Sequence, residues 1–220
     1  MTSAVAEPRQ HEGVRRAEPL AWFGLAGIVV YVLIDVLLKF LRPDYSLLYN
    51  AESDYGRGPW FWVMDLNFLL RCALSLAVVL AIARSARLTG LLRGGLTLLA
   101  IWAIASGLLA FFADDIEGTP QQGSGVVHLI LAFVAFLAVT VGAILVSFGL
   151  RAEESWRSSV PALLTVSILG AIALLVLGHA TGHRHAPGGL YERIFLALEL
   201  LWFALAAIQV LRRGPAPAGS

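Results

Sequence analysis

The sequence is poor in charged residues and nearly free of cysteine, and both shortages narrow the class of protein. Only 14% of its 220 residues are charged, against about 25% in an average soluble chain. The single cysteine, Cys72, has no partner for an intrachain disulfide, so cysteine usage does not indicate a redox compartment. A net charge of +1 gives no basic excess, and nucleic acid is therefore not expected as a partner.

Apolar residues make up 58% of the chain and are gathered in six long runs. A helix needs about 20 mainly apolar residues to cross the hydrocarbon core of a bilayer, where its backbone amides must be paired internally. The connections between the runs are too short to hold a soluble domain. The sequence therefore predicts an all-α, polytopic membrane bundle of six transmembrane helices, at residues 20–41, 60–83, 91–112, 126–150, 160–179 and 190–211.

Basic residues gather on one side of the predicted bundle and indicate its orientation. Short loops rich in Lys and Arg are retained in the cytoplasm. Ten arginines flank the side that carries both termini, whereas five basic residues flank the other side. Both termini are therefore expected to be cytoplasmic in a multi-pass protein of the cell membrane. The predicted domains are a cytoplasmic N-terminal segment (1–19), the transmembrane domain (20–211) and a disordered cytoplasmic tail (212–220).

The polar residues of the apolar runs concentrate near the outer ends of the predicted helices. Depth follows from the helical rise of about 1.5 Å per residue. Ionisable groups at membrane depth face protein or water rather than lipid, so this one-sided set predicts an outward-facing polar pocket. The residues expected to line it and to bind a ligand are Asp65, Arg71, Asp115, His128, Glu192, Arg193 and Glu199.

The connection before the second predicted helix allows two interpretations. Residues 53–59 either fold over the pocket or form a tight turn into the helix, and their Gly and Pro residues favour the tight turn. Several aromatic residues fall at the predicted outer interface, where Trp and Tyr are typical of any membrane protein. An aromatic belt is therefore expected to include Tyr55, Trp60, Trp62, Phe111, Phe112 and Tyr191.

Short motifs in the predicted outer loops resemble a known family. Residues 42–46 read RPDYS, residues 52–59 read ESDYGRGP, and residues 62–64 read WVM. Two further blocks agree, one around Asp114, Asp115 and His128 and one from Leu190 to Trp202. In order and spacing these blocks resemble the domain-of-unknown-function family numbered 998, which consists of prokaryotic six-pass membrane proteins. The resemblance implies a six-helix bundle and no established activity.

The leading hypothesis is a membrane protein that binds a lipid or an amphiphilic small molecule in the outer pocket. Membrane lipid is thus the expected partner, and the oligomeric state stays open. No phosphate-binding glycine loop, serine-elbow motif, or haem or flavin signature occurs, so no cofactor is expected.

Two rival hypotheses involve chemistry or transport. The first is an intramembrane enzyme, either a metal-dependent hydrolase or an acid-catalysed lipid- or terpenoid-modifying enzyme. It would use Asp115, His128 or Glu192, because crowded carboxylates become proton donors. Asp114 and Glu117 lie in the same acidic loop as Asp115. His179, His183 and His185 have a spacing that suits a metal, but the nearby Gly and Pro residues favour a loop, so no metal site is assigned. A proton-coupled transporter is disfavoured because the cytoplasmic halves lack the polar residues that an alternating pathway would need.

Arg71 is the one arginine deep within a predicted span, and it needs a partner. An unpaired charge near the bilayer centre costs at least about 2.5 to 3.5 kcal/mol. Counting inward from the helix ends gives Arg71 and Glu199 nearly equal depths of about 16 and 13 Å. The sequence therefore predicts an Arg71–Glu199 ion pair, with Asp35 or Asp65 as shallower alternatives.

Overall fold

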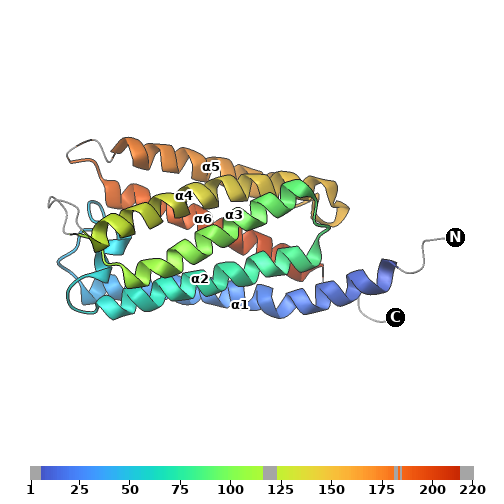
Figure 1. Ribbon diagram of the computed structural model, residues 1–220, viewed down its shortest axis with the longest axis horizontal. Helices are drawn as coiled ribbons and strands as arrows, with labels where there is room; N and C mark the ends of the chain where they lie inside the picture. Colours follow the sequence, from blue (N-terminus) through green and yellow to red (C-terminus); the bar gives the residue numbers. More distant parts are fainter. Residues whose placement is uncertain (1–5, 116–122, 181–182, 184, 214–220) are drawn as a thin grey trace.

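The computed structural model describes residues 6–115, 123–180, 183 and 185–213, and in these residues the fold is all-α. Six long helices make up most of the described chain (Figure 1). They are α1 (Ala6–Leu41), α2 (Phe61–Ser85), α3 (Gly90–Leu108), α4 (Ser124–Gly149), α5 (Val160–Ala180) and α6 (Gly188–Arg212). Short 3-10 helices lie between them: η1 (Glu52–Gly56), η2 (Leu109–Phe111), η3 (Leu150–Ala152) and η4 (Glu154–Trp156).

Each long helix contains a segment that is long and apolar enough to cross a membrane. The six candidate spans found in the described residues are 21 to 29 residues long, with mean hydropathies of 1.9 to 2.9. They coincide with the six predicted apolar runs, apart from small differences at the ends. The structure thus confirms six candidate spans, which indicates a multi-pass membrane protein.

Helix α1 is much longer than its apolar run. It begins at Ala6, although the predicted span begins at residue 20 and the candidate span of the structure begins at Ala17. The preceding segment contains Glu, Arg and Gln, which are good helix formers despite their polarity. Hydropathy detects only the part of a helix that fits in lipid, so this extension gave no signal.

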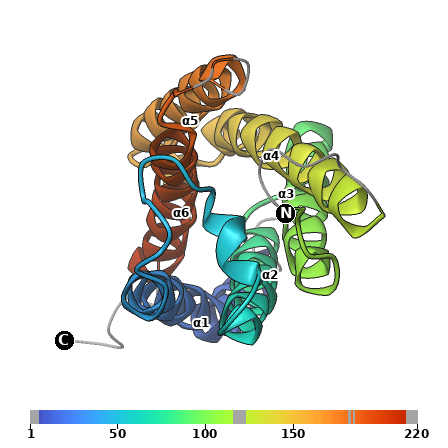
Figure 2. The ribbon, with the colours of Figure 1, turned by 90° about the vertical axis from the view of Figure 1, so that its left-hand side faces the viewer.

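The six helices form a ring in which each helix packs against the next and α6 returns to α1. The view along the bundle shows this order, and α2 also contacts α6 across the ring (Figure 2). Two small residues allow α3 and α4 to pack closely. A Cβ on Gly95 would lie 2.8 Å from the backbone nitrogen of Val146, and one on Gly142 would lie 3.1 Å from the carbonyl oxygen of Gly95.

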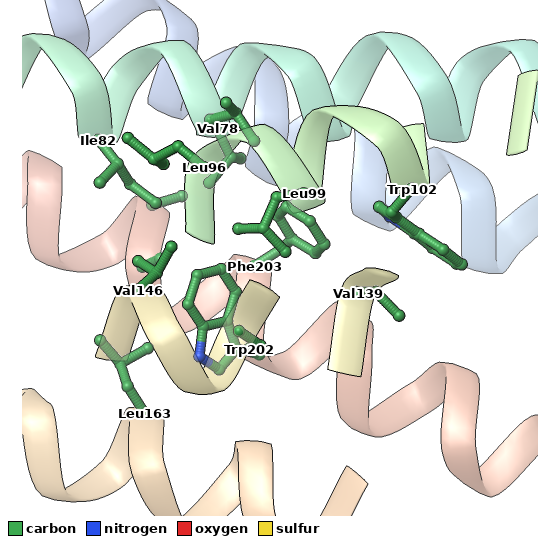
Figure 3. Packing of buried hydrophobic residues seen from close by; sticks show 14 of the residues in the cluster. Val78, Ile82, Leu96, Leu99, Trp102, Val139, Val146, Leu163, Trp202 and Phe203 are labelled. Atoms are coloured by element: carbon green, nitrogen blue, oxygen red, sulfur yellow. The ribbon is translucent and has the colours of Figure 1, made fainter. Parts of the chain in front are cut away.

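A large apolar core fills the space between the helices. Figure 3 shows Leu99, Val146, Trp202 and Phe203 meeting from α3, α4 and α6. The indole nitrogen of Trp202 donates a hydrogen bond to Ser147 Oγ at 3.0 Å. Aromatic rings of this size contribute most of the buried area in such a core, and the buried indole needs the polar partner that Ser147 supplies.

The outer surface of the bundle is also apolar. Within the α1 span, only 22% of the most apolar 18-residue stretch is buried. Trp22, Phe23, Leu33 and Phe40 are exposed on this helix. Soluble proteins rarely expose apolar patches of this extent. A hydrocarbon environment accounts for this surface, in agreement with the candidate spans.

The two ends of the bundle carry different connections. The α1–α2, α3–α4 and α5–α6 connections belong to one end, called here the cap end (Figure 1). The start of α1, the end of α6 and the other two connections belong to the opposite end, called the terminal end. The cytoplasmic position of the terminal end stays a prediction from the arginine count.

Reporter fusions test that orientation. A reporter fused at Ser220 should indicate cytoplasm, and one inserted between Gly123 and Ser124 should indicate the opposite side, because an odd number of spans separates the two positions. A third fusion after Arg87, at the terminal end, should agree with the one at Ser220. Finding the fusions at Gly123 and Ser220 on the same side would contradict the span count, and an inverted pattern would contradict the charge argument.

Candidate functional site

The connection between α1 and α2, residues 42–60, folds over the cap end and is called the cap. Figure 2 shows it lying across the mouth of the bundle between α6 and α2. Its η1 turn carries three residues, Glu52, Asp54 and Tyr55, whose side chains are buried, and Tyr55 is only 1% exposed. The chain also turns tightly into α2, where Phe61 N donates to Gly58 O at 3.4 Å, so both interpretations of this connection hold. Tyr55 does not join an interfacial belt, whereas Trp60, Trp62 and Phe111 are exposed as expected.

Arg42 holds the two ends of the cap together. Its Nη1 donates to the carbonyl oxygens of Arg57 and of Pro59, the latter at 3.2 Å. Its Nη2 pairs with Asp44 Oδ2 at 2.9 Å, and this hydrogen bond holds the pKa of the Asp44 carboxyl below its usual value. Arg42 is buried although it belongs to a connection, so its role in the described structure is to shape the cap.

The cap is also tied to the start of α6. Arg193 Nη1 donates to the carbonyl oxygen of Asn50 at 2.7 Å, and the backbone nitrogen of Leu190 donates to Leu48 O at 3.1 Å. The backbones approach so closely that a Cβ on Gly189 would lie 2.8 Å from the carbonyl carbon of Asn50. Only glycine leaves room for this contact.

A third contact joins the cap to the segment that follows α3 and η2. Arg57 donates to a carboxylate oxygen of Asp54 and to the backbone carbonyl of Asp115. Burial raises the pKa of the Asp54 carboxyl, and the positive charge of Arg57 opposes that shift. Asp115, which the sequence placed in a ligand pocket, thus contacts the cap through its backbone.

Beneath the cap, a buried cluster joins α1, α2 and the cap. Tyr31 Oη donates to Glu52 Oε1 at 2.6 Å, and Arg71 Nη1 donates to Tyr31 Oη at 2.9 Å. Arg71 Nη1 also lies 3.8 Å from Glu52 Oε2. Arg71 and Glu52 are each 3% exposed, so their charges neutralise each other away from water.

Aromatic rings surround the Arg71 guanidinium. Its central carbon lies 5.0 Å from the ring centre of Trp102, 5.1 Å from that of Phe68 and 5.6 Å from that of Tyr31. Cation–π contacts within about 6 Å are attractive, and more so when the cation is desolvated. Arg71 therefore faces the protein interior, as predicted.

The predicted Arg71–Glu199 ion pair is wrong, because Arg71 takes Glu52 as its partner. Glu199 is 2% exposed and packs against α5, where its Oε1 would lie 2.7 Å from a Cβ on Gly170. Neither Glu199 carboxylate oxygen has a hydrogen-bond partner among the described residues. Equal depth along two helices did not place the two side chains on facing sides.

A small cavity lies beside the cluster, with a volume of about 20 Å³, which is room for about one water molecule. It brings together His128 and Glu192, two of the predicted catalytic candidates, and the predicted ligand residue Arg71. Its other lining residues are Glu52 and Ser53 from the cap and the apolar side chains of Phe68, Leu109, Ala132 and Phe136.

The remaining predicted site residues lie outside this cavity lining. Asp65 is half-buried on α2, next to Gly56 of the cap, and Arg193 binds the cap as described above. Contact between the Asp115 carboxylate and His128 stays a prediction. His128 Nδ1 contacts the carbonyl oxygen of Phe112 at 2.7 Å, near Asp115 in the sequence. Glu117 lies outside the described residues.

The histidines at the end of α5 do not assemble a metal site in the described part of the chain. The rings of His179 and His183 lie 4.4 Å apart, and His183 Nδ1 contacts the backbone oxygen of His179 at 2.9 Å. No group of three or more potential metal ligands forms among the described residues.

The sequence reasoning missed Tyr31 and Glu52, the two residues that complete the Arg71 cluster. Tyr31 lies within an apolar run, where a single phenol resembles any other aromatic side chain. Glu52 lies in a connection, where a carboxylate is ordinarily solvated. The signal that could have found Glu52 was Arg71, an arginine within a span. Its charge required an acidic partner, and that partner could come from a connection as well as from a helix.

A bundle of six candidate spans with an enclosed ionised cluster defines a polytopic membrane protein with an internal polar site at one end. The family model described as "Protein of unknown function (DUF998)" matches residues 25–209, so this chain belongs to that family. The match confirms the resemblance seen in the sequence and covers every residue of the cavity lining. No curated protein and no solved structure matches the chain.

Proposed function

We propose that the protein binds an amphiphile at the cap end, with a small cationic or hydrogen-bond-donating head group in the cavity beside Glu192. The observation that carries the proposal is the cavity lining, which combines ionisable groups from the cap, α2, α4 and α6 with an apolar wall. Such a mixture of apolar wall and few convergent polar groups is typical of ligand sites.

The charges around the cavity favour a positive head group. Glu192 lies within electrostatic range of Glu52 and Asp54, but each of these acids is paired with its own arginine, Arg71 and Arg57. Arg193 uses its Nη1 for backbone carbonyls. Arg71 and Arg193 also lie within electrostatic range of Glu192, but among the described residues Glu192 forms no ion pair with either, so a cation or donor in the cavity would give it a direct partner.

The volume of the cavity restricts the head group further. A space of about 20 Å³ admits a group of the size of water, such as a primary ammonium or a hydroxyl, and not a phosphate or a sugar. Phe68 and Phe136 in the wall suit the first methylenes of an attached chain. The ligand class is therefore a long-chain amine or an amine-bearing lipid.

Binding of dodecylamine to the purified protein in a neutral detergent tests this proposal. Dodecylamine should raise the melting temperature of the wild type, and Glu192→Gln should weaken its binding by about tenfold or more, since a charge-assisted hydrogen bond contributes about 1.5 to 3 kcal/mol. Glu154→Gln, which removes an exposed acid at the terminal end, is the matched control. Equal binding to both variants, or equal stabilisation by dodecyl sulfate, would refute the proposal.

A second function, acid–base catalysis on the bound amphiphile, is favoured by the tautomer of His128. Its Nδ1 must donate to the Phe112 carbonyl, because a carbonyl carries no proton, which leaves Nε2 to accept one in the neutral ring. His128 and Glu192 line the same cavity, so an imidazole nitrogen that can accept a proton lies beside the proposed head-group site. His128→Gln should then keep dodecylamine binding and abolish conversion of a lipid extract, followed by mass spectrometry.

The buried polar residues nearer the terminal end give less support to a proton-coupled transporter than the cavity gives to ligand binding. Gln209 is occupied by Ser159 Oγ and by the backbone oxygen of Ser155. Ser147 and Ser167 contact each other at 3.3 Å. Among the described residues, these side chains bond to one another or to backbone and add no buried acid to a path across the bundle.

A further inference from the structure

The α4–α5 connection at the terminal end forms an open groove that the cap-end site does not involve. The groove has a volume of about 410 Å³, within the range of about 300 to 1,000 Å³ that ligand pockets occupy. Arg151 and Arg157 line it together with Val160, Pro161 and Leu164. Two cations thus border an apolar floor.

The groove lies where two candidate spans end. The α4 span runs to Ala152, so Arg151 is at its last turn, and the α5 span begins at Val160. Val160 and Leu164 are one helical turn apart, and their side chains form the floor from the same face of α5. The arginines are therefore at the boundary between hydrocarbon and the polar lipid region, and the floor consists of the exposed edges of Val160 and Leu164, which otherwise belong to the core.

Both guanidinium groups are available to a ligand. Arg151 contacts the ring of Phe148 at 4.3 Å, and among the described residues neither Arg151 nor Arg157 forms an ion pair. Of the two acids in the connection, Glu153 accepts a hydrogen bond from the backbone nitrogen of Arg87, and Glu154 does not line the groove. The groove consequently has an uncompensated positive charge.

We propose that this groove is a binding site for one anionic phospholipid. The phosphate is held by Arg151 and Arg157, whose planar guanidinium groups match phosphate oxygens in pairs. One acyl chain lies along Val160 and Leu164. The proposal is independent of the function assigned to the cap end and of the orientation of the protein, because each leaflet has such a boundary.

The test compares lipid binding to detergent-purified full-length variants by native mass spectrometry, with dioleoyl-phosphatidylglycerol and dioleoyl-phosphatidylcholine as probes. Phosphatidylglycerol should bind the wild type more tightly than phosphatidylcholine does. Arg151→Gln with Arg157→Gln should weaken phosphatidylglycerol binding about 30-fold, since each basic residue near an anionic lipid contributes about a factor of five. Both side chains are exposed, so the double variant should fold, which its melting temperature verifies.

The matched control is Arg93→Gln with Arg212→Gln, which removes two exposed arginines at the same end but outside the groove. It should change binding less than about fivefold, the factor for a single basic residue. A loss equal to that of the groove variant would show general surface attraction and overturn the proposal. Leu164→Phe should reduce lipid binding while leaving inorganic phosphate binding unchanged. If inorganic phosphate at equal concentration displaces the lipid, the site recognises free phosphate and the lipid proposal is wrong.

Discussion

Replacing Arg71 with alanine is expected to destabilise the protein by about 3 to 5 kcal/mol, because the change leaves the Glu52 carboxylate buried without its cation. Tyr31 would also lose the hydrogen bond that Arg71 donates. Conservative replacement by Lys should restore only part of the loss, since an ammonium lacks the planar group that stacks among three rings. The free energy of unfolding is measured by titration with sodium dodecyl sulfate in mixed micelles, followed by tryptophan fluorescence.

A double-mutant cycle assigns the partner. Arg71→Ala and Glu52→Ala together should destabilise the protein less than the sum of the two single changes, because removing both charges leaves neither one buried alone. Arg71→Ala with Glu199→Ala should be additive to within about 0.5 kcal/mol, as for residues without shared partners. Additivity for Glu52 combined with coupling for Glu199 would reverse the assignment made from the structure.

Gly189→Ala should displace the cap and lower stability by about 1 to 3 kcal/mol, the usual effect of overpacking. The added Cβ would meet the Asn50 backbone, which cannot turn aside as a flexible side chain does. Displacement would also break the Arg193–Asn50 hydrogen bond and expose Arg57. Limited trypsin digestion after Arg57, together with the melting temperature, measures the effect.

The neighbouring Gly188→Ala is the control for that experiment. A Cβ at Gly188 would have no atom within 4 Å, so alanine there should be neutral or stabilising through its helix propensity. Faster cleavage in Gly188→Ala than in Gly189→Ala would contradict the close packing of the cap against α6. Equal behaviour of both variants would show that helix propensity alone governs the result.

Element positions were predictable because a span obeys a local rule. The apolar run at 60–83 became α2 (Phe61–Ser85), and the run at 190–211 became α6 (Gly188–Arg212). The hydrocarbon thickness sets the length, and lipid excludes unpaired backbone, so composition alone locates the helix. The start of α1 at Ala6 escaped this rule because those residues have no apolar signal.

The sequence predicted how deep the site residues lie along their helices, but not which neighbouring helix each side chain faces. Counting residues correctly assigned His128 and Glu192 to one end, and the structure brings them to one cavity. The same counting wrongly paired Arg71 with Glu199, because depth along a helix contains no information about which neighbour its face meets. That information depends on how six helices are arranged in a ring, which the periodicity of uniformly apolar spans does not encode.

By itself, the sequence determined that the helices lie in lipid and how many candidate spans there are and how long. It also determined that Arg71 needs a buried partner. Each of these follows from a local free energy, the cost of moving a backbone amide or a charge into hydrocarbon. The tertiary structure alone decided that the partner is Glu52 and that the cap closes one end. Those choices depend on long-range contacts between the cap, α1, α2 and α6, where Gly189 and Arg193 hold a polar connection against the bundle.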